Sequence, residues 1–135
     1  MHQPRFVFLA VPQTAGDEEP VIHRVSWALM SPNNRPLGRS AIGYSSYGAC
    51  KEAVELVRRE FRRATTVATP LAAGGRWAWR IELLGQTIAQ SSRSYLRVRE
   101  WQYNLERFLE AVPVAEISPG TRIVRARAVA PALPA

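Results

Sequence analysis

The clearest pattern of apolar and polar positions in the chain starts within residues 43–63. Apolar residues recur there at intervals of three and four positions, with charged residues between them, which predicts an amphipathic helix with one buried face. The apolar positions are Cys50, Ala53, Val54, Val57, Phe61 and Ala64. Ser45 and Ser46 precede the pattern, and a serine hydroxyl at either position can accept a hydrogen bond from the first free amides of the helix.

A second pattern of the same period predicts a helix over about residues 94–111. Its apolar face consists of Val98, Trp101, Leu105, Phe108, Leu109 and Val112. Short segments rich in β-branched and aromatic residues predict strands around the two helices. They cover residues 5–11, 21–30, 36–41, 65–71, 77–83 and 87–90. Alternation within these segments places Trp27, Trp77 and Trp79 on core-facing positions.

The two halves of the chain share one order of residues, which indicates an internal duplication. The first half carries Trp27, Leu37, Ser40 and Tyr44 before its helix, and the second carries Trp79, Ile88, Ser91 and Tyr95. The offset is 52 residues from Trp27 to Trp79 and 51 from Tyr44 to Tyr95, because the turn at residues 31–36 is replaced by a shorter one. Along the helices, apolar positions of one half correspond to apolar positions of the other.

The residues around the first helix resemble the YegP-like family, a bacterial domain of uncharacterised function. The family pattern is a strand with an aromatic residue, a turn, a strand ending near a serine, and then G-Y-S-S-x-x-x-C-x-x-x-[VI]-x-x-[VI]. The first half matches at Trp27, Leu37, Ser40, Gly43, Tyr44, Ser45, Ser46, Cys50, Val54 and Val57. The second half keeps Trp79, Ile88, Ala89, Ser91 and Tyr95 but departs at Leu96, Arg97 and Trp101. The resemblance implies tandem β-β-β-α(-β) units that share one sheet, and it implies no activity.

We therefore predict an α+β fold in which tandem β-β-β-α(-β) repeats form one antiparallel sheet with two helices packed on one face. Residues 1–66 are the first repeat, residues 67–117 the second, and residues 118–135 a basic Ala/Pro-rich C-terminal strand or tail. Residues 121–129 fit either a final strand, which the resemblance favours, or a disordered tail. Because the duplication supplies two units in one chain, we expect a monomer with internal pseudo-two-fold symmetry.

The chain is strongly basic, with a formal net charge of +7, and Lys51 is its only lysine. Two interpretations stay open. A basic surface is the electrostatic footprint of a nucleic-acid-binding protein. A GC-rich genome also favours arginine and alanine codons over lysine, and we give this compositional explanation the greater weight.

The sequence contains no clear catalytic or metal-binding constellation. His2, His23 and Cys50 are far apart, whereas a metal site needs several such ligands at short spacing. Cys50 lies on the apolar helix face, which is typical of a small core residue rather than a nucleophile. Asp17 is the only aspartate and lies in an acidic loop. We expect a protein that is not an enzyme and holds no metal or cofactor.

The candidate site is a basic surface that binds nucleic acid non-specifically through its phosphates. Its predicted residues are Arg93, Arg97, Arg99, Arg122, Arg125 and Arg127. The arginines at the end of the first helix alternate with glutamates, so we interpret them as a solvated face. A protein–protein interaction or inhibitor module that uses a sheet edge or sheet face is the alternative function. The apolar run at residues 6–11 is too short for a membrane span, so we expect a cytoplasmic protein with no membrane contact.

Overall fold

The structure is a computed structural model that describes residues 3–13, 22–71 and 74–123. In chain order its elements are β1 (Arg5–Gln13), β2 (Ile22–Met30), β3 (Pro36–Arg39), α1 (Tyr47–Glu60), a 3₁₀ turn (Phe61–Arg63), β4 (Thr65–Pro70), β5 (Trp77–Leu83), β6 (Gln86–Gln90), α2 (Val98–Ala111), β7 (Glu116–Ile117) and β8 (Arg122–Ile123). The predicted α+β class and the two helices are confirmed. Of the segment 121–129, the structure describes β8 only, and Arg125 and Arg127 lie outside the described residues.

All eight strands join one sheet, in the order β4-β5-β6-β3-β2-β1-β7, with β8 also pairing with β1. The pairs from β4 to β1 are antiparallel, and the two three-stranded halves meet at one pair, Arg39 with Gln90. However, β7 and β8 run parallel to β1. The sheet is therefore mixed rather than wholly antiparallel as predicted, because α2 acts as a crossover that returns the chain to the far side of β1.

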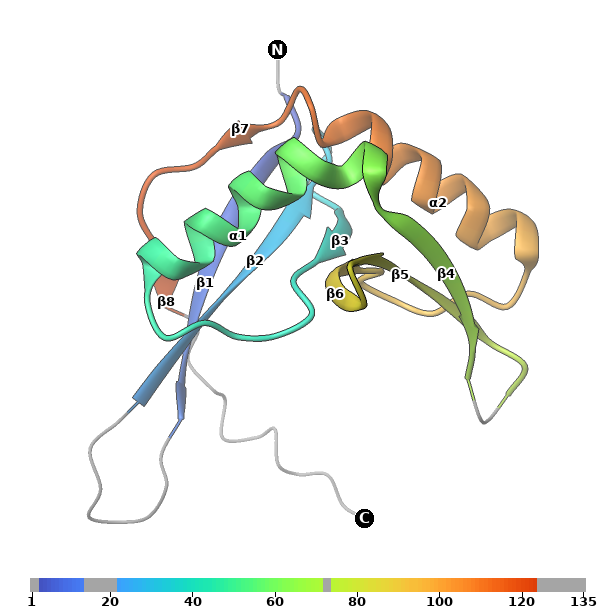
Figure 1. The fold of residues 1–135 in the computed structure, drawn as a ribbon, viewed down its shortest axis with the longest axis horizontal. Helices are drawn as coiled ribbons and strands as arrows, with labels where there is room; N and C mark the ends of the chain where they lie inside the picture. The colour runs from blue at the N-terminus through green and yellow to red at the C-terminus, as the bar shows by residue number, and fades with distance from the viewer. Residues whose placement is uncertain (1–2, 14–21, 72–73, 124–135) are drawn as a thin grey trace.

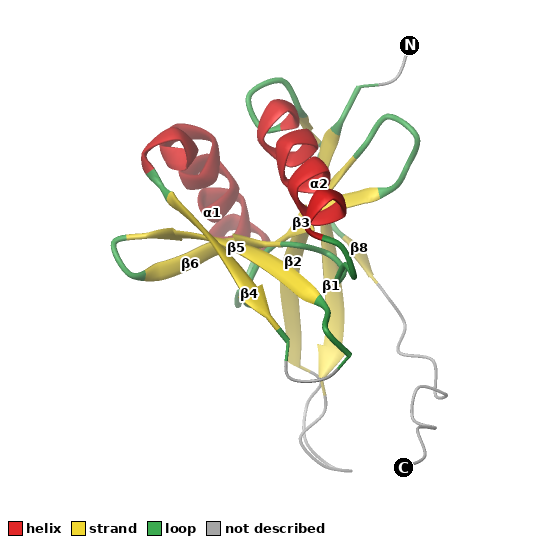
Figure 2. Cartoon of the chain, turned by 90° about the vertical axis from the view of Figure 1, so that its right-hand side faces the viewer, coloured by secondary structure: helices red, strands yellow, loops and turns green. Residues whose placement is uncertain are grey.

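Both helices lie on the same side of the sheet (Figures 1 and 2). The two edges of the sheet lie far from one another (Figure 1). One edge is β4, and at the other edge β7 and β8 pair with β1. The buried faces of the helices and the inward faces of the strands form one hydrophobic cluster. The predicted placement of both helices on one face is thus confirmed, and no separate core exists for each half of the described chain.

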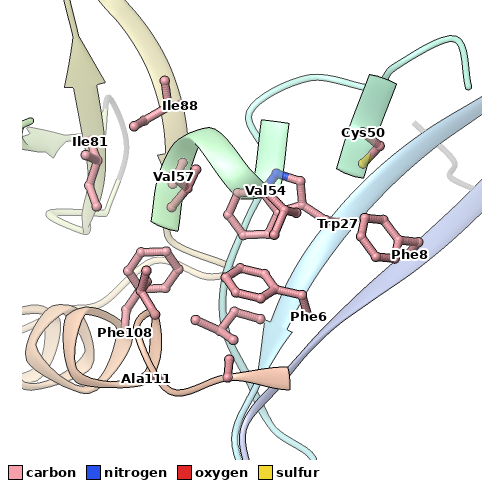
Figure 3. Packing of buried hydrophobic residues seen from close by; sticks show 14 of the residues in the cluster. Phe6, Phe8, Trp27, Cys50, Val54, Val57, Ile81, Ile88, Phe108 and Ala111 are labelled. Carbon is pink, nitrogen blue, oxygen red and sulfur yellow. The ribbon is translucent and has the colours of Figure 1, made fainter. Parts of the chain in front are cut away.

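Aromatic side chains from both halves meet at the centre of this core. The ring of Phe108 from α2 lies between the two indoles, with centroid distances of 6.4 Å to Trp27 and 4.9 Å to Trp79. Phe6 and Phe8 from β1 point into the same space as Val54 and Cys50 of α1 (Figure 3). Because all these side chains are fully buried, the core depends on residues from both halves at once.

The two halves contain matching hydrogen bonds at the positions that the sequence pairs. The backbone N–H of Trp27 donates to Ser40 Oγ at 3.2 Å, and that of Trp79 donates to Ser91 Oγ at 3.2 Å. The antiparallel bridges also match, since Val25 pairs with Tyr44 as Trp77 pairs with Tyr95. The predicted boundary between residues 66 and 67 falls inside β4, which follows α1 and also pairs with β5.

A local contact explains where each helix begins. In α1, Ser46 is the N-cap, and its Oγ accepts a hydrogen bond from the Ala49 N–H at 3.1 Å, as predicted. In α2, the helix begins at Val98 rather than near residue 94, because Tyr95 is held in extended pairing with Trp77. The Glu100 carboxylate accepts a hydrogen bond from the N–H of Arg97 at 3.2 Å. A carboxylate at the N-terminus of a helix interacts favourably with the helix dipole, whereas the neighbouring arginines interact unfavourably with it.

Candidate functional site

A groove of about 710 Å³ runs along the N-terminal half of α2. Three other segments complete its walls: the β2–β3 turn with the start of β3, the residue just before β5, and the segment between β6 and α2. Its lining residues are Ser31, Asn33, Arg35, Pro36, Leu37, Arg76, Arg93, Ser94, Tyr95, Leu96, Glu100, Tyr103, Asn104 and Arg107. The groove therefore gathers residues from both halves of the chain.

The lining charge is strongly positive. Four arginines and one glutamate face the groove, so its formal charge is 4 − 1 = +3. The ion pairs found among the described residues join Arg59 and Arg63 to Glu60, and Arg80 to Glu82. None of these pairs involves a groove arginine, so no described carboxylate neutralises the groove arginines and their charges can attract an anionic ligand.

Backbone contacts fix two of these arginines in place. In the β2–β3 turn, the Arg35 N–H donates to Ser31 Oγ at 3.1 Å, and the Ser31 N–H donates to the Arg35 carbonyl at 2.8 Å. On the opposite wall, Arg76 Nη1 donates to the Ser94 carbonyl at 3.4 Å. These contacts fix the backbone of the turn that carries Arg35 and tie the Arg76 side chain to the segment between β6 and α2.

The floor of the groove is tied to the core by Asn104. Its Oδ1 accepts a hydrogen bond from the Trp79 indole Nε1–H at 2.6 Å, and its Nδ2 donates to the Leu37 carbonyl at 3.2 Å. One side chain thus links α2 to a strand from each half of the chain. This link positions the face of α2 that carries Tyr103 and Arg107.

Two tyrosines contribute differently to the groove. Tyr95 is half-buried, and burial raises the pKa of its phenol, with a smaller opposing influence from the charge of Arg93. It is therefore a neutral hydrogen-bonding group at physiological pH. Tyr103 is 63% exposed, and the Arg107 guanidinium lies 5.9 Å from its ring centroid. An exposed ring beside a cation offers a stacking surface for a planar ligand.

The structure brings one of the predicted site residues into this groove and leaves the others outside it. Arg93 lines the groove, whereas Arg97 and Arg99 are exposed at the start of α2 and do not line it. Arg122 is exposed on β8, and β6, β3, β2 and β1 separate β8 from the β5 strand that Tyr95 pairs with. Arg93 and Arg122 therefore do not lie in one groove, because β8 lies beyond the far side of β1. Nucleic-acid binding by the predicted arginines stays a prediction.

Three groove arginines were missed by the sequence analysis: Arg35, Arg76 and Arg107. The sequence does contain a pattern that indicates Arg107. The spacing of Glu100, Tyr103, Asn104 and Arg107 places all four on one helix face. Arg35 and Arg76 carry no local signal, since only the tertiary fold brings their loops to that face.

The arginines at the end of α1 match the predicted solvated face. Arg59 and Arg63 both contact the Glu60 carboxylate, and Arg58 Nη2 donates to the Pro113 carbonyl at 3.3 Å. Glu60 partly neutralises the charges of Arg59 and Arg63, whereas no described ion pair involves a groove arginine.

Cys50 is fully buried, as predicted for a core residue. Burial raises the pKa of its thiol from 9.0 to about 12. In the described parts of the chain, no three His, Cys, Asp or Glu side chains gather as potential metal ligands. Nor does any described helix have the length and apolar character needed to cross a bilayer.

The fold is similar to that of two proteins solved in solution by NMR. One is yegP from E. coli, a protein of unknown function, with 13% identity, a TM-score of 0.59, and coverage of 90% of this chain and 95% of that one. The other is a UPF0339 protein from Shewanella oneidensis, with 11% identity, a TM-score of 0.58, and coverage of 89% and 92%. No protein-family model and no curated protein sequence matches the chain. The YegP-like fold expected from the sequence is confirmed, while the duplication stays a prediction.

Proposed function

We propose that this chain is a binding module that associates with single-stranded nucleic acid, without sequence preference, through the arginine-lined groove on α2. The observation that carries the proposal is the charge of that groove, with four arginines and a single glutamate on its walls. Guanidinium groups bind phosphate oxygens through paired, charge-assisted hydrogen bonds. A flexible strand with regularly spaced phosphates can contact several of them at once.

The aromatic and apolar lining favours a single strand over a duplex. Tyr103 and Leu96 are 63% and 56% exposed, and both line the groove. A base can stack on such a surface only when it is free of its own helical neighbours. Because every base has a flat face, this contact adds affinity without sequence preference.

The test is fluorescence anisotropy with labelled oligo-dT, oligo-U and a duplex of equal length, across a salt series. Arg93→Gln and Arg107→Gln are each expected to lower affinity and to reduce the salt dependence of log K by about 0.7, the value for one phosphate contact on a single strand. Tyr103→Ala is expected to weaken binding by about 1–3 kcal/mol with the salt dependence unchanged, because stacking releases no counterion.

Two further variants remove positive charge elsewhere, one charge in the first and three in the second. Arg59→Gln, at the exposed end of α1, should change affinity little, because that side chain already contacts Glu60. A triple Arg122→Gln, Arg125→Gln and Arg127→Gln variant tests the C-terminal arginines that the sequence favoured. If the tail variant, and not the groove variants, loses binding, the groove is not the site. Absence of binding at low salt would make the net charge a consequence of composition.

A further inference from the structure

The two halves of the chain differ in the first strand of each half. Phe8 of β1 pairs with Trp27, and Ala68 of β4 pairs with Trp79, so Phe8 and Ala68 occupy equivalent positions. By the same register Phe6 is equivalent to Thr66, because they pair with Leu29 and Ile81. The first half thus places two fully buried phenyl rings where the second half has a threonine and an alanine.

A groove of about 560 Å³ lies beside these small residues, between β4 and α2. It is lined by Thr66, Ala68, Trp101, Gln102, Leu105 and Glu106. Trp101 stands where the first half has Cys50, so its larger side chain replaces part of the missing volume but does not fill the groove. Its indole Nε1–H is buried, and no described residue accepts a hydrogen bond from it.

The edge strands of the two halves also differ in what covers them. The outer edge of β1 pairs in parallel with β7 and β8. The Glu116 N–H donates to the Pro4 carbonyl at 3.0 Å, the Ser118 N–H donates to the Phe6 carbonyl at 3.0 Å, and Ile117 packs against the core. No strand among residues 3–13, 22–71 and 74–123 pairs with the outer edge of β4.

Before its last residue, the exposed edge of β4 carries no charge or proline that would hinder the addition of another strand. Its sequence, TTVATP, contains no charged residue, and its only proline is the last residue. Natural sheets usually protect such edges with charge, bulges or a covering segment. At β1 the covering segment is β7, a short extended strand with one apolar side chain, Ile117, packed against the core.

We propose that β4 and the groove beside it bind an extended segment of a partner protein, which pairs in parallel with β4 as β7 pairs with β1. An aromatic or large aliphatic side chain of the segment, in the role of Ile117, lies beside Thr66. From there it packs toward Ala68, Trp101 and Leu105, which line the groove. Recognition by main-chain pairing plus one side-chain pocket is a known mode of peptide binding.

This site is independent of nucleic-acid binding. Gln102 and Glu106 line the peptide groove, while Tyr103 and Arg107 line the basic groove on another face of α2. A loss of one activity therefore need not change the other.

The probe is a fluorescein-labelled synthetic peptide with the sequence of residues 113–123, the segment that covers the equivalent edge. We expect saturable binding to the full chain, with slower hydrogen exchange of the β4 amides when peptide is present. The Ala68→Phe variant fills the groove as Phe8 does in the first half, so it should weaken binding at least tenfold. A peptide with aspartate in place of Ile117 should bind at least tenfold more weakly as well.

Matched variants separate the groove from general surface effects. Ile42→Phe adds an equal ring at a site that is 61% exposed and away from the groove, and should leave binding unchanged. Arg93→Gln should also leave it unchanged. If Ala68→Phe does not fold, Ala68→Leu makes the same comparison with a smaller side chain. The proposal fails if the peptide does not bind, if Ala68→Phe binds it normally, or if the peptide protects β1 in place of β4.

The oligomeric state distinguishes a separate partner protein from a second copy of this chain. Light scattering of the chain alone should give a monomer at all concentrations used for binding. A concentration-dependent dimer that Ala68→Phe abolishes would assign the β4 edge to a second copy of this chain and overturn the proposal of a separate partner.

Discussion

Gly38 of β3 leaves the space that the ring of Phe108 occupies in the centre of the core. A Cβ atom at residue 38 would lie 2.5 Å from Phe108 Cδ1 and 3.0 Å from Trp79 Cη2. Phe108 is fully buried between the two indoles and has no room to move aside. A glycine inside a strand usually weakens it, but here the close approach of α2 to β3 requires it.

Gly38→Ala is therefore expected to destabilise the chain by about 1–3 kcal/mol through overpacking. Urea denaturation measures this as a lower midpoint with an unchanged slope. Adding Phe108→Leu should recover part of the loss, which a double-mutant cycle would detect as coupling between the two sites. Gly48→Ala is the matched control, because its Cβ would meet only Ser46 Oγ at 3.9 Å. In a helix this change should stabilise by about 0.5–1 kcal/mol. Equal costs at both glycines would contradict the packing argument.

The link from Trp79 through Asn104 to the Leu37 carbonyl provides a second prediction. Asn104→Ala leaves the buried Trp79 indole N–H without its acceptor, at an expected cost of about 1–3 kcal/mol. Glu110→Ala, at an exposed position of the same helix, should change stability by less than about 0.5 kcal/mol. In ¹H–¹⁵N NMR spectra, the indole resonance of Trp79 should move on Asn104→Ala, while that of Trp27, whose Nε1 has no partner in the described structure, should move less. A shift confined to Trp27 would show that the bond has been assigned to the wrong indole.

The elements of this fold were largely predictable from the sequence, because each helix and strand carries its own period. The helix face through Cys50, Val54 and Val57 is buried as predicted. The parallel pairing of β7 and β8 was not predictable, since two-residue strands carry no period and their partner is more than one hundred residues distant in the chain. The basic groove was predictable only in part. Arg93 was found from local arginine density, but Arg35 and Arg76 join it through tertiary contacts that no local pattern encodes.

The matching hydrogen bonds of Ser40 and Ser91 test whether the two halves are equivalent in energy as well as in geometry. Each hydroxyl is buried and accepts from a tryptophan backbone N–H at 3.2 Å. Ser40→Ala and Ser91→Ala should each cost about 1–3 kcal/mol, because each leaves a buried amide without that acceptor. Ser45→Ala, at an exposed position, is the control and should be near neutral. A large cost at one serine and none at the other would mean that the two halves match in geometry but not in stability.

The buried thiol of Cys50 gives a prediction about its reactivity. Because its pKa is raised from 9.0 to about 12, the fraction present as thiolate near pH 8 is about 1000-fold lower than for a free thiol. A disulfide reagent should therefore modify Cys50 slowly in the native chain and rapidly in urea, and rapid native modification would contradict its burial.

The same shift predicts how stability depends on pH. The folded thiol stays protonated at pH values where the unfolded thiol ionises, so the folded state binds more protons. Its contribution is fully present below pH 9 and is lost as pH rises from 9 to about 12. The raised phenol pKa values of Tyr44 and Tyr95, both due mainly to burial, act in the same direction. Urea denaturation across this range should show a slope up to about 1.4 kcal/mol per pH unit steeper for the natural chain than for Cys50→Ala. Equal slopes for the two chains would show that the thiol ionises as readily in the folded state as in the unfolded one.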